Sequence, residues 1–326
     1  MSSAWLAAPP PLESLRGGPE PARVGNVLFG TASWTDRTLL ASRAFYPAVV
    51  RTPAQRLAYY ARHFPVVEVD ASYYALPSAR NAQAWVDRTP ADFVFGVKAF
   101  AALTQHPFEP MRLDKDINAA LPATLRRARR LFARDVPPEV MDAIWERFRT
   151  ALAPLAQAGK LSYVLVQMPP WFRPSDESRA YLAEVATRLA GLPLAVEFRQ
   201  AGWLGERLRA PTLDFLRACH LTYVSVDEPQ GTAASVPPIA EVTTPALAVV
   251  RFHGRRTDTW RKPGAGTHER FGYVYRPDEL AQWVPRIRKL AAGARRVLVL
   301  MNNCHREAAV QNAKDLATLL SASAEA

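Results

Sequence analysis

The sequence predicts an α/β fold, a single (β/α)8 barrel of the TIM type, and three observations support this prediction. Eight short apolar runs recur along the chain, segments of helical length and pattern separate most of them, and most runs end in polar or charged residues. Alternation of strand and helix repeated eight times is typical of a parallel sheet closed into a barrel. A chain of 326 residues is within the usual size of one such domain.

The predicted strands are the apolar runs at residues 26–34, 66–74, 93–100, 163–172, 194–203, 222–228, 246–255 and 296–304. The predicted helices have amphipathic patterns and lie at residues 52–63, 78–88, 139–158, 177–190, 211–220, 277–291 and 307–320. A barrel of this kind carries its chemistry on the loops at the carboxyl ends of its strands. Polar residues where the runs end are therefore the candidates for a functional site.

Residues 1–23 are rich in proline and alanine and lack the basic start and apolar middle of an export signal. We expect them to form a disordered or loosely draped tail before one barrel domain at 24–326. No apolar stretch approaches the roughly 20 residues that cross a bilayer, which excludes an integral membrane protein. The two cysteines, Cys219 and Cys304, have neither zinc-site nor disulfide spacing. The expected compartment is the cytoplasm.

The formal net charge is +11, and five arginines crowd the segment after the third strand. A basic balance of this size attracts polyanions at low salt. The crowded arginines are either a solvated face or a patch that contacts a polyanion, and the sequence leaves both readings open. They are Arg126, Arg127, Arg129, Arg130 and Arg134.

Two long interruptions break the regular alternation. One covers residues 103–138 after the third strand, and the other covers residues 254–275 after the seventh strand. Long excursions in compact domains often form lids or binding loops. Since both leave from the face where the strands end, we expect them to roof the mouth of the barrel together.

The second and third strands end in charged residues. Strand periodicity puts Glu68 and Asp70 on one side, and buried carboxylates need cationic partners. Lys98, at the end of the third strand, and Arg199, at the end of the fifth, are the natural partners. For both carboxylates a structural ion pair and a chemical role stay open. Four roles stay open for Lys98: a simple salt bridge, a clamp for an anion, an acid or base in proton transfer, or the amine of a Schiff base.

The fourth, fifth and sixth strands add further candidates. Gln167 is a neutral donor and acceptor that orients a substrate or a neighbouring carboxylate. Glu197 and Arg199 share one side of the fifth strand, where the guanidinium lowers the pKa of the carboxylate. Such a pair suits electrostatic work or metal ligation, or it stabilises the barrel. Asp227 ends the sixth strand and is explained as well by turn formation as by function.

The seventh strand carries the most plausible general acid or base. Arg251 and His253 lie on one side, and histidine titrates near neutrality. The eighth strand ends with Asn302 and Asn303, amides able to hold a substrate hydroxyl or phosphate. Cys304 follows them and is read as an incidental thiol in preference to a nucleophile.

Taken in order, these strand ends resemble the family called domain of unknown function 72 (DUF72), also named YecE-like. The matching pieces lie at 30–34, 45–47, 68–74, 95–98, 167–170, 197–199 with Trp203, 251–254, and 302–303 with 312–313. The resemblance implies a TIM-like barrel and supplies no reaction. Relatives commonly carry an acidic residue or threonine where this chain has Cys304. Within the pieces we expect substrate contacts from Ser33, Trp34, Tyr73, Gln167, Arg199, Trp203, Arg251, Asn302 and Asn303.

The leading hypothesis is an enzyme of hydrolase or isomerase type that acts on a phosphorylated or otherwise anionic substrate. In it the cations hold the anion, and the catalytic residues are His253, Glu68, Asp70, Lys98 and Glu197. One alternative is a divalent-metal enzyme with ligands among Glu68, Glu197, Asp227 and His253. Another is a nucleic-acid-binding protein or nuclease that uses the basic surface. No nucleotide-cofactor motif is found.

Overall fold

The structure is a computed structural model that describes residues 22–231, 235–260, 262 and 267–322. Residues 1–21 of the predicted tail lie outside this range. The last residue of that tail, Arg23, belongs to a short strand, β1 (Arg23–Val24), which pairs antiparallel with β2 (Val27–Thr31). Gly25 makes the turn between them with a φ of +57°, a conformation in which glycine avoids the strain of a side chain.

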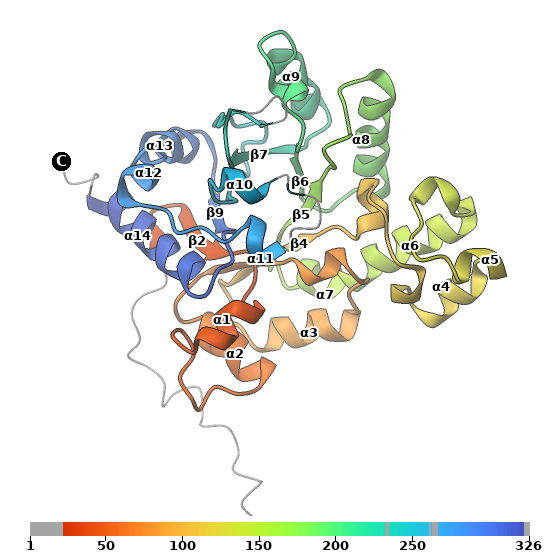
Figure 1. Cartoon of the computed structure of the whole chain (residues 1–326), viewed down its shortest axis with the longest axis horizontal. Helices are drawn as coiled ribbons and strands as arrows, with labels where there is room; N and C mark the ends of the chain where they lie inside the picture. Colours follow the sequence, from red (N-terminus) through yellow and green to blue (C-terminus); the bar gives the residue numbers. More distant parts are fainter. Residues whose placement is uncertain (1–21, 232–234, 261, 263–266, 323–326) are drawn as a thin grey trace, which may run out of the picture.

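Eight parallel strands, β2 to β9, form a closed barrel, as the sequence predicts (Figure 1). Each strand pairs with the next along the chain, and β2 pairs with β9 to close the sheet. After β2 the strands are β3 (Val66–Val69), β4 (Val94–Lys98), β5 (Leu161–Gln167), β6 (Leu194–Glu197), β7 (Thr222–Asp227), β8 (Ala248–Phe252) and β9 (Val297–Met301).

The register of the strands decides which side chains enter the barrel, because paired residues of parallel strands face the same side. Glu68 pairs with Gly96, and Gly96 pairs with Tyr163. A Cβ atom on Gly96 would lie 2.3 Å from Cζ of Tyr163, so only glycine leaves room for that ring. The Tyr163 ring therefore crosses the interior, and its hydroxyl donates to Glu68 over 2.7 Å.

Helices cover the outside of the barrel. They are α1 (Arg37–Ser42), α2 (Pro53–Tyr60), α3 (Ala79–Asp87), α4 (Lys115–Ala120), α5 (Ala123–Arg126), α6 (Pro138–Ala151), α7 (Ala153–Gln157), α8 (Asp176–Arg188), α9 (Arg209–Ala218), α10 (Thr257–Trp260), α11 (Thr267–Arg270), α12 (Pro277–Ala281), α13 (Val284–Gly293) and α14 (Ala308–Ala322). No helix in the described ranges is long and apolar enough to cross a membrane.

Two predicted helices are each divided in the structure. The pattern at 139–158 predicts one helix, but α6 ends before Leu152 and α7 starts afresh around Pro154. The pattern at 277–291 divides in the same way into α12 and α13, with Pro285 in the first turn of α13. A proline lacks the N–H that continues a helix, and its ring collides with the preceding turn. The prolines therefore explain both divisions.

The two excursions lie differently from the prediction that both roof the mouth. In the first, α4 and α5 lie beside α6 at the flank of the barrel (Figure 1), and Arg147 of α6 pairs with Asp116 of α4 over 2.5 Å. His106, near its beginning, contacts Tyr73 after β3, and Arg130 lines a cavity together with the same tyrosine. The second excursion carries α10 and α11, and its Trp260 and Phe271 rings lie 6.2 and 5.9 Å from the His253 ring. This excursion covers the mouth.

Candidate active site

Arg251 of β8 lies at the centre of the barrel and is fully buried. Its Nη2 donates to Oε1 of Glu68 over 2.5 Å, and its Nη1 donates to Oε2 of Glu197. Burial by itself would lower the pKa of Arg251, but the Glu197 and Glu68 carboxylates outweigh it and the pKa is raised. The guanidinium therefore stays charged and joins β3, β6 and β8 across the interior.

The two carboxylates that hold Arg251 differ in their protonation. For Glu68, burial raises the pKa more strongly than Arg251 lowers it. For Glu197, burial also raises the pKa, but Arg251 and His253 outweigh it and hold the pKa well below its usual range. Glu197 is therefore a permanent carboxylate, and Glu68 ionises less readily.

The Oε1 oxygen of Glu197 accepts three side-chain contacts. Gln167 Nε2 donates over 2.7 Å, His253 Nε2 lies at 2.9 Å, and Arg199 Nη1 donates over 3.2 Å. Donors of this kind stabilise the ionised form of a carboxylate. The carboxylate thus fixes three predicted site residues in place, and it is the common partner that orients them.

His253 is fully buried and uses both ring nitrogens. The amide of Asn302 donates to Nδ1 over 2.9 Å, so Nε2 carries the proton that faces Glu197. The pKa of His253 is lowered to about 4, mainly by burial. Glu197 opposes this shift by raising the pKa, whereas the charges of Arg199 and Arg251 lower it. The imidazole is therefore neutral around pH 7, and its contacts make it a support for Glu197.

Lys98 and Asp70 form an ion pair that solvent reaches. Lys98 Nζ lies 2.8 Å from Oδ1 of Asp70, and the two side chains are 12% and 27% exposed. The Ser72 hydroxyl donates to the Lys98 carbonyl over 2.6 Å and ties the ends of β3 and β4 together. The Lys98 ammonium also lies 4.5 Å from the centre of the Tyr73 ring. Lys98 and Asp70 are thus an ion pair at the strand ends that keeps some contact with solvent.

Arg199 is a second partly exposed cation at the mouth. Its side chain is 16% exposed, it pairs with Glu228 over 3.2 Å in addition to Glu197, and its guanidinium lies 4.7 Å from the Trp260 ring. Three planar contacts of this kind restrict its rotamers. Glu197, Glu228 and the Trp260 ring thus hold Arg199 in place at the mouth.

The sequence interpretation missed His106, which lies between the two cations. Burial, together with the charges of Lys98 and Arg199, lowers the pKa of His106 to about 4. Its ring lies 5.3 Å from Tyr73 and 5.8 Å from Trp171, which is 55% exposed. The available signal was that this is the only histidine in residues 103–138. Together the rings form an aromatic wall beside Lys98.

Four residues predicted to contact substrate make contacts within the protein, and their predicted role stays a prediction. Trp203 is buried in a stack with Phe172 and Phe198, and Asn303 is buried and donates to the Tyr273 carbonyl and to Asn312. Trp34 packs edge-on against Trp85, and the Ser33 hydroxyl accepts from the Thr35 amide.

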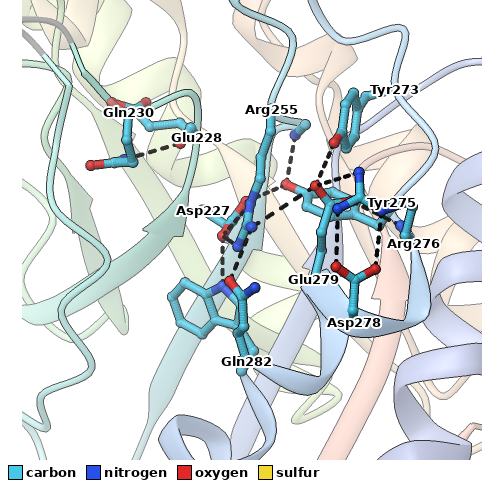
Figure 2. Close-up of polar contacts among 12 residues, drawn as sticks. Asp227, Glu228, Gln230, Arg255, Tyr273, Tyr275, Arg276, Asp278, Glu279 and Gln282 are labelled. Carbon is cyan, nitrogen blue, oxygen red and sulfur yellow. Dashed lines mark hydrogen bonds and ion pairs between the residues drawn. The ribbon is translucent and has the colours of Figure 1, made fainter.

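Asp227 faces the helices outside the barrel, since it pairs in register with Phe252, which packs against Trp283. Figure 2 shows its carboxylate surrounded by donors: Tyr275 at 2.6 Å, the indole of Trp283 at 2.6 Å and Arg255 at 2.7 Å. All of these side chains belong to the segment that follows β8. Asp227 thus anchors that segment to the end of β7.

The four predicted metal ligands do not converge, because Asp227 faces outward whereas Glu68, Glu197 and His253 face inward. Within the part of the chain that the structure describes, no group of three His, Cys, Asp or Glu side chains is placed to hold one ion. Cys304 lies near the mouth, and burial raises the pKa of its thiol well above the usual range. Its thiol is therefore a poor nucleophile.

Comparison with known proteins identifies the family. The family described as Protein of unknown function DUF72 matches residues 28–326. UPF0759 protein YunF of Bacillus subtilis (strain 168) is 32% identical over 298 residues, 90% of this chain and 94% of that protein. Among solved structures, a DUF72 family protein of Enterococcus faecalis V583 has 26% identity and a TM-score of 0.72, over 90% of this chain and 95% of its own.

A DUF72 family protein of Thermotoga maritima MSB8 has 28% identity and a TM-score of 0.70, and the match covers 90% of this chain and 99% of that one. The matches run along nearly the whole barrel and include every strand end described above. The chain therefore belongs to the DUF72 family of proteins of unknown function.

Proposed function

We propose that this protein is an enzyme of hydrolase or isomerase type that binds a small anionic substrate, such as a phosphorylated compound, at the carboxyl ends of its strands. The observation that carries the proposal is the solvent-accessible ion pair of Lys98 and Asp70 at the strand ends, where Arg199 is a second partly exposed cation. Pairs of acid and base at a barrel mouth are the usual starting point for proton transfer.

In this proposal Lys98 and Arg199 hold the anion. Both cations keep some exposure, and charge-assisted hydrogen bonds from lysine and arginine are strong contacts for phosphate. An anion that contacts Lys98 releases Asp70 from its ion pair. The freed carboxylate then accepts a proton from the substrate, and the lysine ammonium stabilises the negative charge that develops.

The buried residues act as supports in this arrangement. Glu197 orients Arg199 and Gln167, while His253 and Asn302 fix Glu197. The contacts therefore favour a division of roles that differs from the sequence hypothesis, in which His253 moves protons. Arg251 balances the charge of the Glu197 carboxylate, and the raised pKa of Glu68 limits further negative charge in the interior, which reduces repulsion of an anionic substrate.

The test is a thermal-shift series with phosphate, sugar phosphates and nucleotides, because a ligand that binds only the folded state raises the melting temperature. We expect a stabilising anion whose effect is lost in Lys98→Ala and in Arg199→Ala. The control is Arg217→Ala, which removes an exposed arginine of α9 that pairs with Asp214. Anion stabilisation that is equal in all four proteins would contradict the proposal.

Nucleic-acid binding is the second candidate, and the exposed arginines at 126–134 favour it. Two half-exposed aromatic rings, Tyr74 and Trp171, lie on the same side of the molecule as the strand ends. Single-stranded nucleic acids bind to such combinations of cations and rings, with a steep dependence on salt. Oligonucleotide binding that survives Lys98→Ala but falls with salt would support this candidate.

A further inference from the structure

A cavity of about 260 Å³ lies beside the barrel mouth, between the segment that follows β3 and the beginning of the first excursion. Aromatic rings and charged groups both line it: Tyr73, Tyr74, Phe108, Glu109, Arg112 and Arg130. Ligand sites commonly combine apolar or aromatic walls with a few polar groups that orient the ligand. Two of these residues have a role predicted from the sequence: Tyr73 as a substrate contact, and Arg130 as one of the crowded arginines that either form a solvated face or contact a polyanion.

The charge balance of the cavity is positive. Glu109 is engaged with Arg112, with 3.3 Å between Oε2 and Nε. Arg130 has no carboxylate within ion-pair distance in the described part of the chain, and its side chain is exposed. One guanidinium of the cavity therefore has its full hydrogen-bonding capacity available for an anion, and a second lies close by in a weak surface pair.

Tyr73 connects this cavity to the mouth. Tyr73 lines the cavity, and the Lys98 ammonium lies 4.5 Å from the centre of the Tyr73 ring. Burial raises the pKa of the Tyr73 phenol, and Arg130 is one of the charges that oppose this rise. The phenol therefore stays protonated at neutral pH and is available as a donor between Lys98 and Arg130.

We propose that the cavity is a second anion subsite for the same substrate, which then carries two phosphate groups on one ring. One phosphate lies at Lys98 and Arg199, the ring packs on Tyr73 and Tyr74, and the second phosphate contacts Arg130 and Arg112. This inference rests on the proposed function and adds the substrate class: a sugar bisphosphate or a nucleoside bisphosphate, which share the ring and the two anionic ends.

Isothermal titration of the full chain with matched probes tests the inference. The probes are fructose 6-phosphate against fructose 1,6-bisphosphate, and adenosine 5′-monophosphate against adenosine 3′,5′-bisphosphate. We expect one bisphosphate to bind about tenfold or more tightly than its monophosphate, the effect of one charged hydrogen bond. The pair that shows this difference tells whether the ring is a sugar or a nucleoside.

Two variants locate the effect. Arg130→Gln should reduce bisphosphate affinity to that of the monophosphate and leave monophosphate affinity unchanged. Arg127→Gln is the control, since Arg127 is an exposed arginine of the same segment that does not line the cavity. Because Arg130 is exposed, neither change should alter the melting temperature. Arg130→Glu should abolish the preference for two phosphates completely.

The outcomes separate this inference from the function on which it rests. Anion binding that needs Lys98 but is indifferent to Arg130→Gln overturns the second subsite alone. Absence of any anion binding that depends on Lys98 overturns both. Equal losses in Arg127→Gln and Arg130→Gln indicate a diffuse basic surface and overturn the subsite. Binding of a single-stranded oligonucleotide through Arg130, with no bisphosphate binding, overturns it in favour of nucleic acid.

Discussion

The guanidinium of Arg251 joins Glu68 and Glu197 across the interior of the barrel, and all three side chains are completely buried. A charge in an apolar interior costs several kcal/mol unless partners neutralise it. Here one cation serves two carboxylates, and the Tyr163 hydroxyl and His253 complete their hydrogen bonding. This buried triad supports the accessible residues of the mouth.

Arg251→Met should destabilise the fold, because it leaves Glu68 and Glu197 buried without their cation. Removal of one partner of a buried ion pair costs about 3–5 kcal/mol. Urea denaturation gives the free energy of unfolding, with Arg217→Ala as the surface control. The double variant Arg251→Met with Glu197→Gln should recover part of the loss, and a single variant as stable as the wild type would contradict the role of the triad.

The neutral His253 predicts a pH dependence of stability. Its pKa in the folded protein is about 4, below the ordinary 6.5. Between these two pH values the unfolded chain binds a proton that the native ring does not bind. This contribution is complete above pH 6.5 and is lost as the pH falls from 6.5 towards 4. Its full size is about 3 kcal/mol, from about 1.4 kcal/mol per pKa unit.

Urea titrations of the wild type and of His253→Gln between pH 4.5 and 7.5 measure this contribution. As the pH falls, the free energy of unfolding should decrease more steeply for the wild type than for the variant. The difference between the two slopes should correspond to about one bound proton. Other buried groups, such as His106, contribute equally to both proteins and cancel in the comparison. Parallel slopes would show that His253 is not the buried neutral ring described above.

Gly96→Ala should disturb the interior although it adds one methyl group. The new Cβ would meet the Tyr163 ring at 2.3 Å, and overpacking of this kind costs about 1–3 kcal/mol. The matched control is Gly205→Ala, where the nearest atom lies 3.7 Å from the new Cβ. Thermal unfolding of both proteins tests the prediction, and Gly96→Ala should cost less stability in a Tyr163→Leu background than in the wild type, because the ring that the new Cβ meets is then absent.

Asp227→Asn should loosen the segment after β8 without unfolding the barrel. The new amide nitrogen would face donors from Tyr275, Trp283 or Arg255, and an unsatisfied buried group costs about 1–3 kcal/mol. Limited proteolysis, or hydrogen exchange over residues 254–275, reports the change. Asp278→Asn is the control, because that exposed carboxylate pairs only with Arg276 (Figure 2). Equal protection in both variants would argue against anchoring by Asp227.

The helix patterns of the sequence predicted the outer layer well, with two instructive errors. The segments at 139–158 and 277–291 keep an apolar face throughout, and that pattern says nothing about a break. Pro154 and Pro285 break them, because each removes a backbone donor. The information was local, and it could have been read from the proline positions alone.

The sequence by itself determined the barrel and the set of polar residues at its strand ends, since periodicity and turn chemistry are local properties of the chain. Only the tertiary structure decided which of those residues stay accessible to solvent and which are buried and paired. Lys98 and Asp70 keep contact with solvent, whereas Arg251 and His253 both pair with Glu197 in the interior. Asp227 turns outward and His106 comes in from an excursion. Exposure and pairing depend on side chains distant in the sequence, which no local pattern records.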